Sequence, residues 1–170
     1  NFASCEPLVV SVNSSSAPLS RWPKIGVQIN IDNISILEQF GDVYGSTIPV
    51  CIRLNPHIMA GGHSHISVGH IDSKFGVSIH QVPHLVRIVK TYDINVNGLH
   101  MHTGSDIYNI EAFLTATEML LNTVKEFDTI GFVDVGSGFK VPYKEGDIST
   151  DIEQLGVQLS ERFNEFCTEL

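Results

Sequence analysis

The feature that most constrains the fold of this chain is a regular alternation of strand-like and helix-like patterns that starts at Gly26. Four short runs of β-branched or other apolar residues are expected to form strands: Val27 to Ile31, Thr47 to Leu54, Val96 to Met101 and Ile130 to Val135. Each run is followed by apolar residues at the three- and four-residue spacing of a helix, from about Ile34, Val82, Ile110 and Ile152. Such βα units in succession predict an α/β fold with a parallel sheet.

Four units do not by themselves decide between two parallel architectures. A closed (β/α)8 barrel needs twice as many units, whereas an open doubly wound sheet is complete with four or five. The last helix is expected to pack through four apolar residues, Ile152, Leu155, Leu159 and Phe163. Thr150 and Glu153 have the spacing of a capping box, which predicts Thr150 as the N-cap of this helix.

The charge and the cysteines argue against several classes of protein. The 170 residues carry 10 Lys and Arg against 19 Asp and Glu, a net charge of −9 with no basic block, so no nucleic-acid partner is expected. The three cysteines, Cys5, Cys51 and Cys167, are far apart and odd in number, which argues against a disulfide scaffold or a structural zinc site. No apolar run approaches the length of a membrane span. We therefore expect a soluble, cytoplasmic protein with no membrane partner.

The first 25 residues differ from the rest of the chain. The sequence starts with Asn1 rather than Met, and residues 12–23 are rich in Ser and Pro. We therefore expect an atypical N-terminal segment at residues 1–25, outside the repeating pattern, and one domain at residues 26–170. The whole sequence is interpreted as a fragment, or as a chain whose start is foreign to the fold.

Two glycine-containing loops follow the last two predicted strands. They read Gly98-Leu99-His100-Met101-His102-Thr103-Gly104-Ser105 and Val133-Asp134-Val135-Gly136-Ser137-Gly138. Both should lie at the carboxyl ends of strands, where parallel α/β folds bind ligands. A phosphate dianion requires clustered backbone N–H groups and a hydroxyl, which Gly136, Ser137, Gly138 and Ser105 can supply. These loops predict a phosphate-bearing cofactor, and the lack of a P-loop or dinucleotide-binding motif argues against a nucleotide.

His100 and His102 are two residues apart on a predicted strand, so their side chains should point to one face. They can converge on a metal, or one can face a cofactor while the other packs. A metal site needs at least three protein ligands, and other histidines lie in the long loop after the second strand, so no metal is predicted. We assign a structural role to His100 and a functional role to His102, which precedes the Gly104-Ser105 turn. Arg53, at the end of the second strand, is either a surface ion-pair residue or a cation that reaches the cofactor or a carboxylate of a neighbouring loop.

Together these motifs resemble the fold-type III pyridoxal-phosphate-dependent decarboxylases, whose catalytic domain is an alanine-racemase-like (β/α)8 TIM barrel. The resemblance covers about Gly26 to Leu170 and implies a partial barrel of about four βα units. The diaminopimelate decarboxylase branch is more similar than the ornithine and arginine enzymes in four segments: Ile52-Arg53-Leu54-Asn55-Pro56, Ala60-Gly61-Gly62, Ile66-Ser67 and Asp72-Ser73-Lys74-Phe75-Gly76.

The resemblance implies a role for each candidate residue. His102 stacks on the pyridine ring of pyridoxal 5'-phosphate, Ser105 and the Gly136-Ser137-Gly138 turn hold the phosphate, and Arg53 lines the cofactor side. Ser137 stands where the family usually has the middle of three glycines; it keeps the N–H and adds a hydroxyl.

The implied reaction is decarboxylation of meso-diaminopimelate to L-lysine and CO2, in lysine biosynthesis, by a homodimer that takes a small amino-acid substrate. The family's Schiff-base lysine, its Glu-Pro-Gly-Arg segment and its C-terminal β domain match no part of this sequence, so the chain alone is expected to be inactive. Three alternatives stay open: an ornithine- or arginine-type amino-acid decarboxylase, a non-catalytic decarboxylase-like binding module, and a metal-dependent barrel hydrolase that uses His100 and His102.

Overall fold

The computed structural model describes residues 9–12, 28–58 and 75–170. Its strands form one sheet in the order β1-β2-β3-β5-β6, with β4 paired to β3 off this path, and every pairing is parallel. The strands are β1 (Val9–Val12), β2 (Gln28–Ile31), β3 (Val50–Asn55), β4 (Val77–Ser78), β5 (Val96–Met101) and β6 (Phe132–Asp134).

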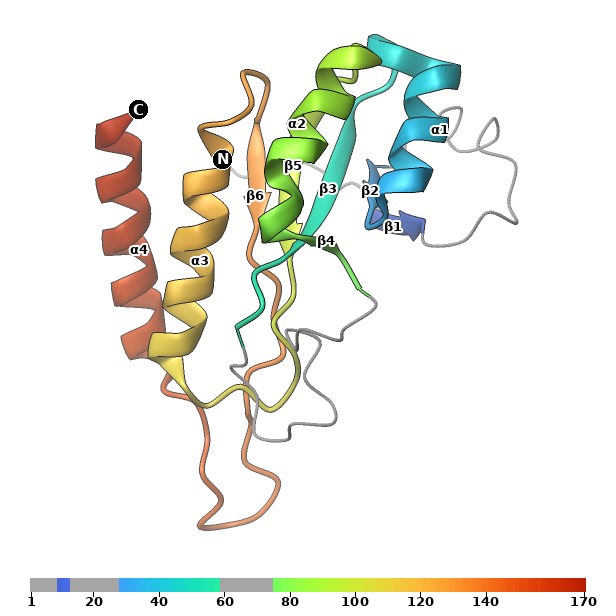
Figure 1. The fold of residues 1–170 in the computed structure, drawn as a ribbon. Helices are drawn as coiled ribbons and strands as arrows, with labels where there is room; N and C mark the ends of the chain where they lie inside the picture. The colour runs from blue at the N-terminus through green and yellow to red at the C-terminus, as the bar shows by residue number, and fades with distance from the viewer. Residues whose placement is uncertain (1–8, 13–27, 59–74) are drawn as a thin grey trace, which may run out of the picture.

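Four helices lie side by side over one face of the sheet (Figure 1). They are α1 (Ile34–Tyr44), α2 (Val82–Thr91), α3 (Ile110–Val124) and α4 (Ile152–Glu169), with short 3-10 turns at Gly45–Thr47 and Ile79–Gln81. Three of the four helices begin at a polar residue whose side-chain oxygen accepts a backbone N–H of the first turn: Asn33, Asn109 and Asp151. None of the helices in the described ranges is long and apolar enough to cross a membrane.

The predicted alternation of strands and helices is confirmed. The third predicted strand coincides with β5, and the fourth is β6 with a shorter extent. The second predicted strand begins three residues later than expected, at Val50. Val27, the expected start of the first strand, lies outside the described residues, as does residue range 59–74 of the long loop after β3. The parallel βα units support the predicted partial barrel.

The sheet begins earlier in the sequence than the expected boundary at residue 26. β1 pairs in parallel with β2 over its whole length, from Val9 opposite Gln28 to Val12 opposite Ile31. β-branched residues favour strands, and Val9, Val10 and Val12 are β-branched. Strands pair through backbone groups, so such a run can add to the open edge of a sheet. Residues 9–12 therefore belong to the same sheet as the predicted domain, whereas residues 1–8 and 13–27 lie outside the described ranges.

The predicted capping box at the start of α4 is wrong by one residue. The N-cap is Asp151, whose Oδ1 accepts the N–H of Gln154 at 2.9 Å. Thr150 is not at the cap because its hydroxyl bonds to another segment, donating to the carbonyl oxygen of Ile107. A carboxylate at the first turn also suits the helix dipole, so Asp151 can take the position that the sequence pattern assigned to Thr150.

The buried face of α4 also differs from the predicted stripe. Leu155 is buried as predicted, whereas Ile152 and Phe163 are 55% and 44% exposed. Phe166, which the predicted stripe did not include, is buried. Phe166 lies against α3, where Lys125 stands over its ring at 5.6 Å. The face of α4 that packs against α3 therefore includes Phe166, near the end of the helix.

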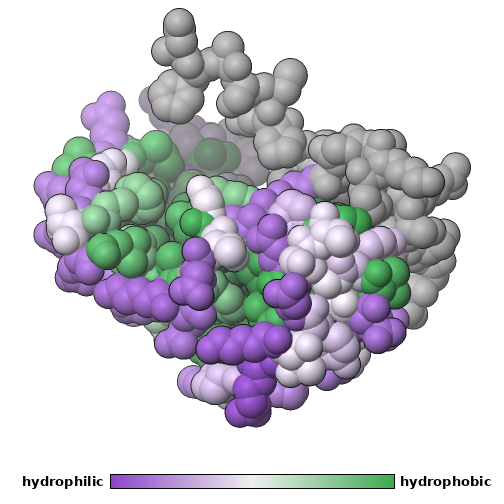
Figure 2. Space-filling view, turned by 90° about the horizontal axis from the view of Figure 1, so that it is seen from above, coloured by the Kyte–Doolittle hydropathy of each residue, from purple (hydrophilic) through white to green (hydrophobic). Residues whose placement is uncertain are grey.

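The core fills the space between the sheet and the helices. Alternate residues of the central strands are fully buried there, among them Ile29, Ile52, Leu54, Leu99 and Met101. From the end of the molecule nearest the amino ends of the strands, hydrophilic residues line the outer rim and hydrophobic ones gather inside it (Figure 2). Because side chains alternate along a strand, the residues between these core positions face the other side of the sheet, and they are mostly polar.

Candidate functional site

A row of ionisable side chains crosses the face of the sheet opposite the four helices, near the carboxyl ends of the strands. Arg53 of β3 is in register with His100 of β5, and His100 is in register with Asp134 of β6. Asp32, directly after β2, interacts electrostatically with Arg53. This is the end at which parallel α/β folds bind their ligands.

Arg53 is held between a carboxylate and an aromatic ring. Its guanidinium carbon is 5.3 Å from the centre of the Phe75 ring, and burial lowers the pKa of Arg53 while Asp32 opposes that shift. Asp32 is 7% exposed, and its pKa is raised by burial and held down by Arg53. Gly76, at a φ of +84°, lies so close to β3 that a Cβ would be 3.0 Å from the carbonyl carbon of Leu54. The turn that carries Phe75 is thus packed on the strand that carries Arg53.

His100, for which the sequence predicts a structural role, is hydrogen-bonded to a side chain of another strand. Its Nδ1 lies 2.8 Å from the side-chain Nδ2 of Asn30, which donates the hydrogen bond. Burial lowers the pKa of His100 to about 4, with the charges of Arg53 and His102 acting in the same direction and Asp134 against it. The imidazole is therefore neutral at physiological pH.

His102 lies at the start of the loop after β5, two residues beyond His100. Burial lowers its pKa, the positive charge of Arg53 lowers it further, and Asp134 opposes both. Gly136 packs directly against it, because a Cβ on Gly136 would be 3.2 Å from Nδ1 of His102 and 2.5 Å from the carbonyl oxygen of Met101. The structure thus brings the second glycine loop against the histidine that the sequence singled out.

The same turn also contacts the Gly104-Ser105 segment. Gly138 has a φ of +107°, and a Cβ there would collide with the carbonyl oxygen of Gly104 and lie 3.3 Å from Cα of Ser105. Gly136 has a φ of +74°, so both glycines adopt conformations that other residues rarely adopt. Close approach and backbone conformation together explain why glycine stands at both positions.

Asp134 fixes the shape of this turn. Its Oδ1 accepts the backbone N–H of Gly136 at 2.8 Å, so that donor is used within the turn. No partner is recorded in the described ranges for the N–H groups of Ser137 and Gly138. Gly136 therefore contributes close packing to the turn, and its N–H is already bonded to Asp134.

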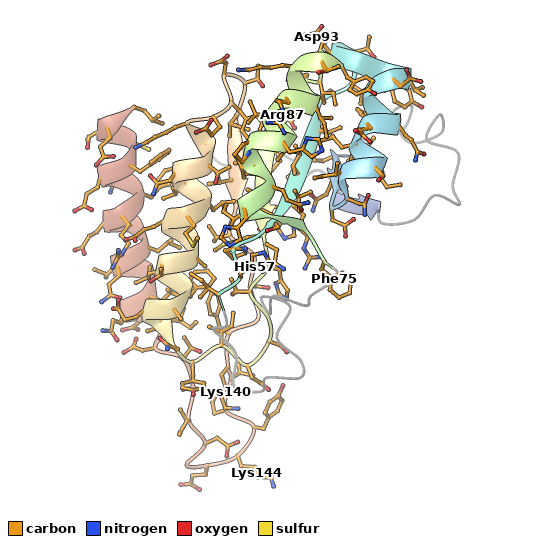
Figure 3. The ribbon with its side chains drawn as sticks, viewed as in Figure 1. His57, Phe75, Arg87, Asp93, Lys140 and Lys144 are labelled. Carbon is orange, nitrogen blue, oxygen red and sulfur yellow. The ribbon has the colours of Figure 1, made fainter. Side chains whose placement is uncertain are left out.

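Figure 3 shows Phe75 and Lys140 toward the carboxyl ends of the strands, at the end of the molecule opposite Asp93. Sequence reasoning missed Asn30, Asp32 and Asp134. A signal for the first two was present in the sequence, because polar residues alternate with apolar ones from Gln28 to Asp32. This alternation marks a strand face turned away from the helices. Among the described residues, no group of three or more His, Cys, Asp or Glu is arranged to hold a metal ion.

The fold and the site define a class of protein: a parallel βα barrel segment that carries a glycine turn, a hydroxyl and an imidazole at the carboxyl end of its sheet. The family model described as "Pyridoxal-dependent decarboxylase, pyridoxal binding domain" matches residues 8–170. The chain belongs to this family. The match includes most of the N-terminal segment that the sequence analysis separated from the domain, in agreement with the pairing of β1.

Individual relatives agree with this assignment. The diaminopimelate decarboxylase of Methanothermobacter thermautotrophicus is 30% identical over 152 residues, which are 85% of this chain and 35% of that protein. A crystal structure of diaminopimelate decarboxylase superposes with a TM-score of 0.75 at 22% identity, covering 90% of this chain and 36% of the other. The arginine decarboxylase of Paramecium bursaria Chlorella virus gives a TM-score of 0.64 at 22% identity, covering 86% and 38%. The chain thus spans about a third of the length of the proteins it matches.

Proposed function

We propose that this chain forms part of the pyridoxal-phosphate site of an amino-acid decarboxylase, and that the whole protein converts meso-diaminopimelate to L-lysine and CO2. The observation that carries the proposal is the packing of the Gly136-Ser137-Gly138 turn against both His102 and Ser105, in a chain of the pyridoxal-dependent decarboxylase family. Pyridoxal phosphate, when bound, supplies an electron sink for the electron pair that remains after CO2 leaves.

The donors around the turn fit a phosphate group. The backbone N–H groups of Ser137 and Gly138 and the hydroxyl of Ser105 lie on two adjoining loops, and the missing Cβ of each glycine lets these loops approach. Backbone N–H groups and a hydroxyl bind a dianion without adding a positive charge that would need its own partner. These residues would hold the phosphate, with Asp134 keeping the turn in shape.

The ring of the cofactor would lie toward His102 and Arg53. A depressed pKa keeps the imidazole of His102 uncharged, which suits stacking on an aromatic ring without electrostatic repulsion from Arg53. Arg53 is held by Asp32 and Phe75, so its charge stays on the ligand side of the sheet. The fixed positive charge and the neutral imidazole together would orient a bound ring.

The choice of diaminopimelate as substrate rests on the relatives. The similarity to a diaminopimelate decarboxylase extends over 85% of the chain at 30% identity. The solved structures of a diaminopimelate decarboxylase and of an arginine decarboxylase are both 22% identical to the chain, and their superpositions support the fold alone. An ornithine- or arginine-type activity is the second candidate, left open by the family resemblance. A homodimeric state stays a prediction from the family resemblance, and a cytoplasmic location stays a prediction from the number and spacing of the cysteines.

The test is a decarboxylation assay on the natural full-length protein, with CO2 release measured from meso-diaminopimelate, ornithine and arginine in the presence of pyridoxal phosphate. We expect release from meso-diaminopimelate alone, and a loss of cofactor affinity in His102→Ala. His84→Ala is the matched control, because His84 is exposed on α2, in the helix layer. Preference for ornithine or arginine would select the second candidate, and absence of pyridoxal phosphate binding would overturn both.

A further inference from the structure

Thr150 joins the two loops of the candidate phosphate site. This residue lies just before α4 and is 7% exposed. Its hydroxyl donates to the carbonyl oxygen of Ile107, in the loop after β5, and accepts the N–H of Lys140 at 3.0 Å, in the loop after β6. Its own N–H donates to the carbonyl oxygen of Lys140 at 2.9 Å. One threonine thus uses its hydroxyl and its backbone to bond both loops.

The two loops also pair with each other beside this threonine. The N–H of Ile107 donates to the carbonyl oxygen of Gly138 at 3.0 Å, and the N–H of Lys140 donates to that of Ile107 at 2.9 Å. Ile107 and Phe139 form a parallel bridge here. Ser105 lies two residues before Ile107, and Gly138 lies two residues before Lys140. The hydroxyl of Thr150 therefore bonds to Ile107 and Lys140, each two residues from a residue that would hold the phosphate.

We propose that Thr150 is a positioning residue that fixes the spacing between the Ser105 and Gly138 loops, so that both can bind one phosphate group. The inference rests on the proposed function. Hydrogen bonds weaken steeply as distance and angle depart from the optimum, so donors on two separate loops bind one anion well only if the loops are held in register. In a variant without the hydroxyl, the backbone hydrogen bonds between the two loops persist, so the fold stays in place. The spacing between the Ser105 and Gly138 loops is then less well defined.

The experiment compares Thr150→Val with Thr150→Ser in the natural full-length protein. Valine keeps the shape of threonine and loses the hydroxyl, whereas serine keeps the hydroxyl. We measure the Kd of pyridoxal phosphate and of pyridoxal, which has the same ring without the phosphate. Thr150→Val should raise the Kd of pyridoxal phosphate about five- to tenfold, since one hydrogen bond is worth about 1 kcal/mol, with the Kd of pyridoxal unchanged. Thr150→Ser should bind both like the natural protein.

Asp151→Ala is the control for helix capping, because it removes the cap of α4 beside Thr150 and leaves the hydrogen bonds between the two loops in place. It should lower the Tm and leave the ratio of the two Kd values unchanged. Thr150→Ala is a second hydroxyl deletion, and it should repeat the phosphate-specific loss.

Three outcomes would overturn the inference. The first is an equal loss for both ligands, and the second is no loss in Thr150→Val. The third is failure of both Thr150→Val and Thr150→Ala to fold, which would make the hydroxyl a requirement of the fold itself. If the natural protein binds no pyridoxal phosphate, the proposed function fails first, and the inference fails with it.

Discussion

The side-chain amide of Asn30 donates a hydrogen bond to Nδ1 of His100 at 2.8 Å, across the strand β3 that lies between their own strands. The bond requires that Nδ1 carry no proton, so the neutral ring of His100 holds its hydrogen on Nε2. Asn30 is 1% exposed, and burial lowers the pKa of His100 to about 4. Two polar side chains thus join β2 and β5 across β3, on the face opposite the helices.

This pairing predicts a pH dependence of stability. The folded pKa of His100, about 4, is below the ordinary value of 6.5, so the unfolded chain binds a proton first as the pH falls. The neutral ring of His100 therefore contributes fully to the free energy of unfolding above pH 6.5. As the pH falls from there to 4, up to about 3 kcal/mol of this free energy is lost. In urea unfolding at a series of pH values, the free energy of unfolding of His100→Gln should change less steeply with pH over this interval than that of the natural protein. The control is His84→Gln, at an exposed site on α2, and an equal change in both variants would contradict the assignment.

The charges of Arg53 and Asp134 should move the pKa of His102 in opposite directions. Arg53 lowers this pKa and Asp134 raises it. Arg53→Gln is therefore expected to raise the pKa of His102, and Asp134→Asn to lower it, both followed by NMR titration of the ring protons. Asparagine retains an oxygen that can accept the N–H of Gly136, so the turn should survive. Arg87→Gln, on the exposed side of α2, should change neither value.

Phe75 should affect His102 through Arg53. A cation–π contact at an exposed or half-exposed site is worth about 0.5–1 kcal/mol, enough to bias where the guanidinium lies. In Phe75→Leu the guanidinium should spend less time near the histidines, so the pKa of His102 should rise in the same direction as in Arg53→Gln and by less. Phe75→Trp keeps an aromatic face and should restore the natural value. A rise in Phe75→Trp equal to that in Phe75→Leu would show that the aromatic ring is not the cause.

The strands and helices could be predicted because each depends on local patterns. The helix at Ile110–Val124 follows from its apolar stripe, and the strand at Val96–Met101 from its β-branched and apolar residues. The two loops around His102 could also be predicted, because glycines directly after a strand mark close backbone approach. These features are set by residues that are near each other in the sequence.

The partners within the site could not be predicted in the same way. Asn30 and His100 are 70 residues apart, and Thr150 and Ile107 are 43 apart. Whether a polar side chain caps a helix or reaches another loop depends on which loop the sheet order places beside it. The spacing of Thr150 and Glu153 suits a capping box, yet the nearby carbonyl of Ile107 takes the hydroxyl and Asp151 takes the cap.

The closest approach between the two site loops predicts a large loss for Gly138→Ala. A Cβ at this position would collide with the carbonyl oxygen of Gly104, and the φ of +107° is itself unfavourable for alanine. Backbone strain of this kind costs about 1–3 kcal/mol, and the collision forces the loops apart in addition. We expect urea unfolding to show a loss of at least about 2 kcal/mol, together with loss of pyridoxal phosphate affinity.

Gly156→Ala is the matched control for this substitution. Gly156 lies within α4 on the exposed surface, and a Cβ there would have no neighbour within 4 Å. Alanine in a helix interior is about 0.5–1 kcal/mol more favourable than glycine, so Gly156→Ala should stabilise the protein and leave cofactor affinity unchanged. The same chemical change is thus expected to act with opposite signs at the two sites. If Gly138→Ala were as stable as the natural protein and bound pyridoxal phosphate equally well, the two loops would not meet as the structure places them.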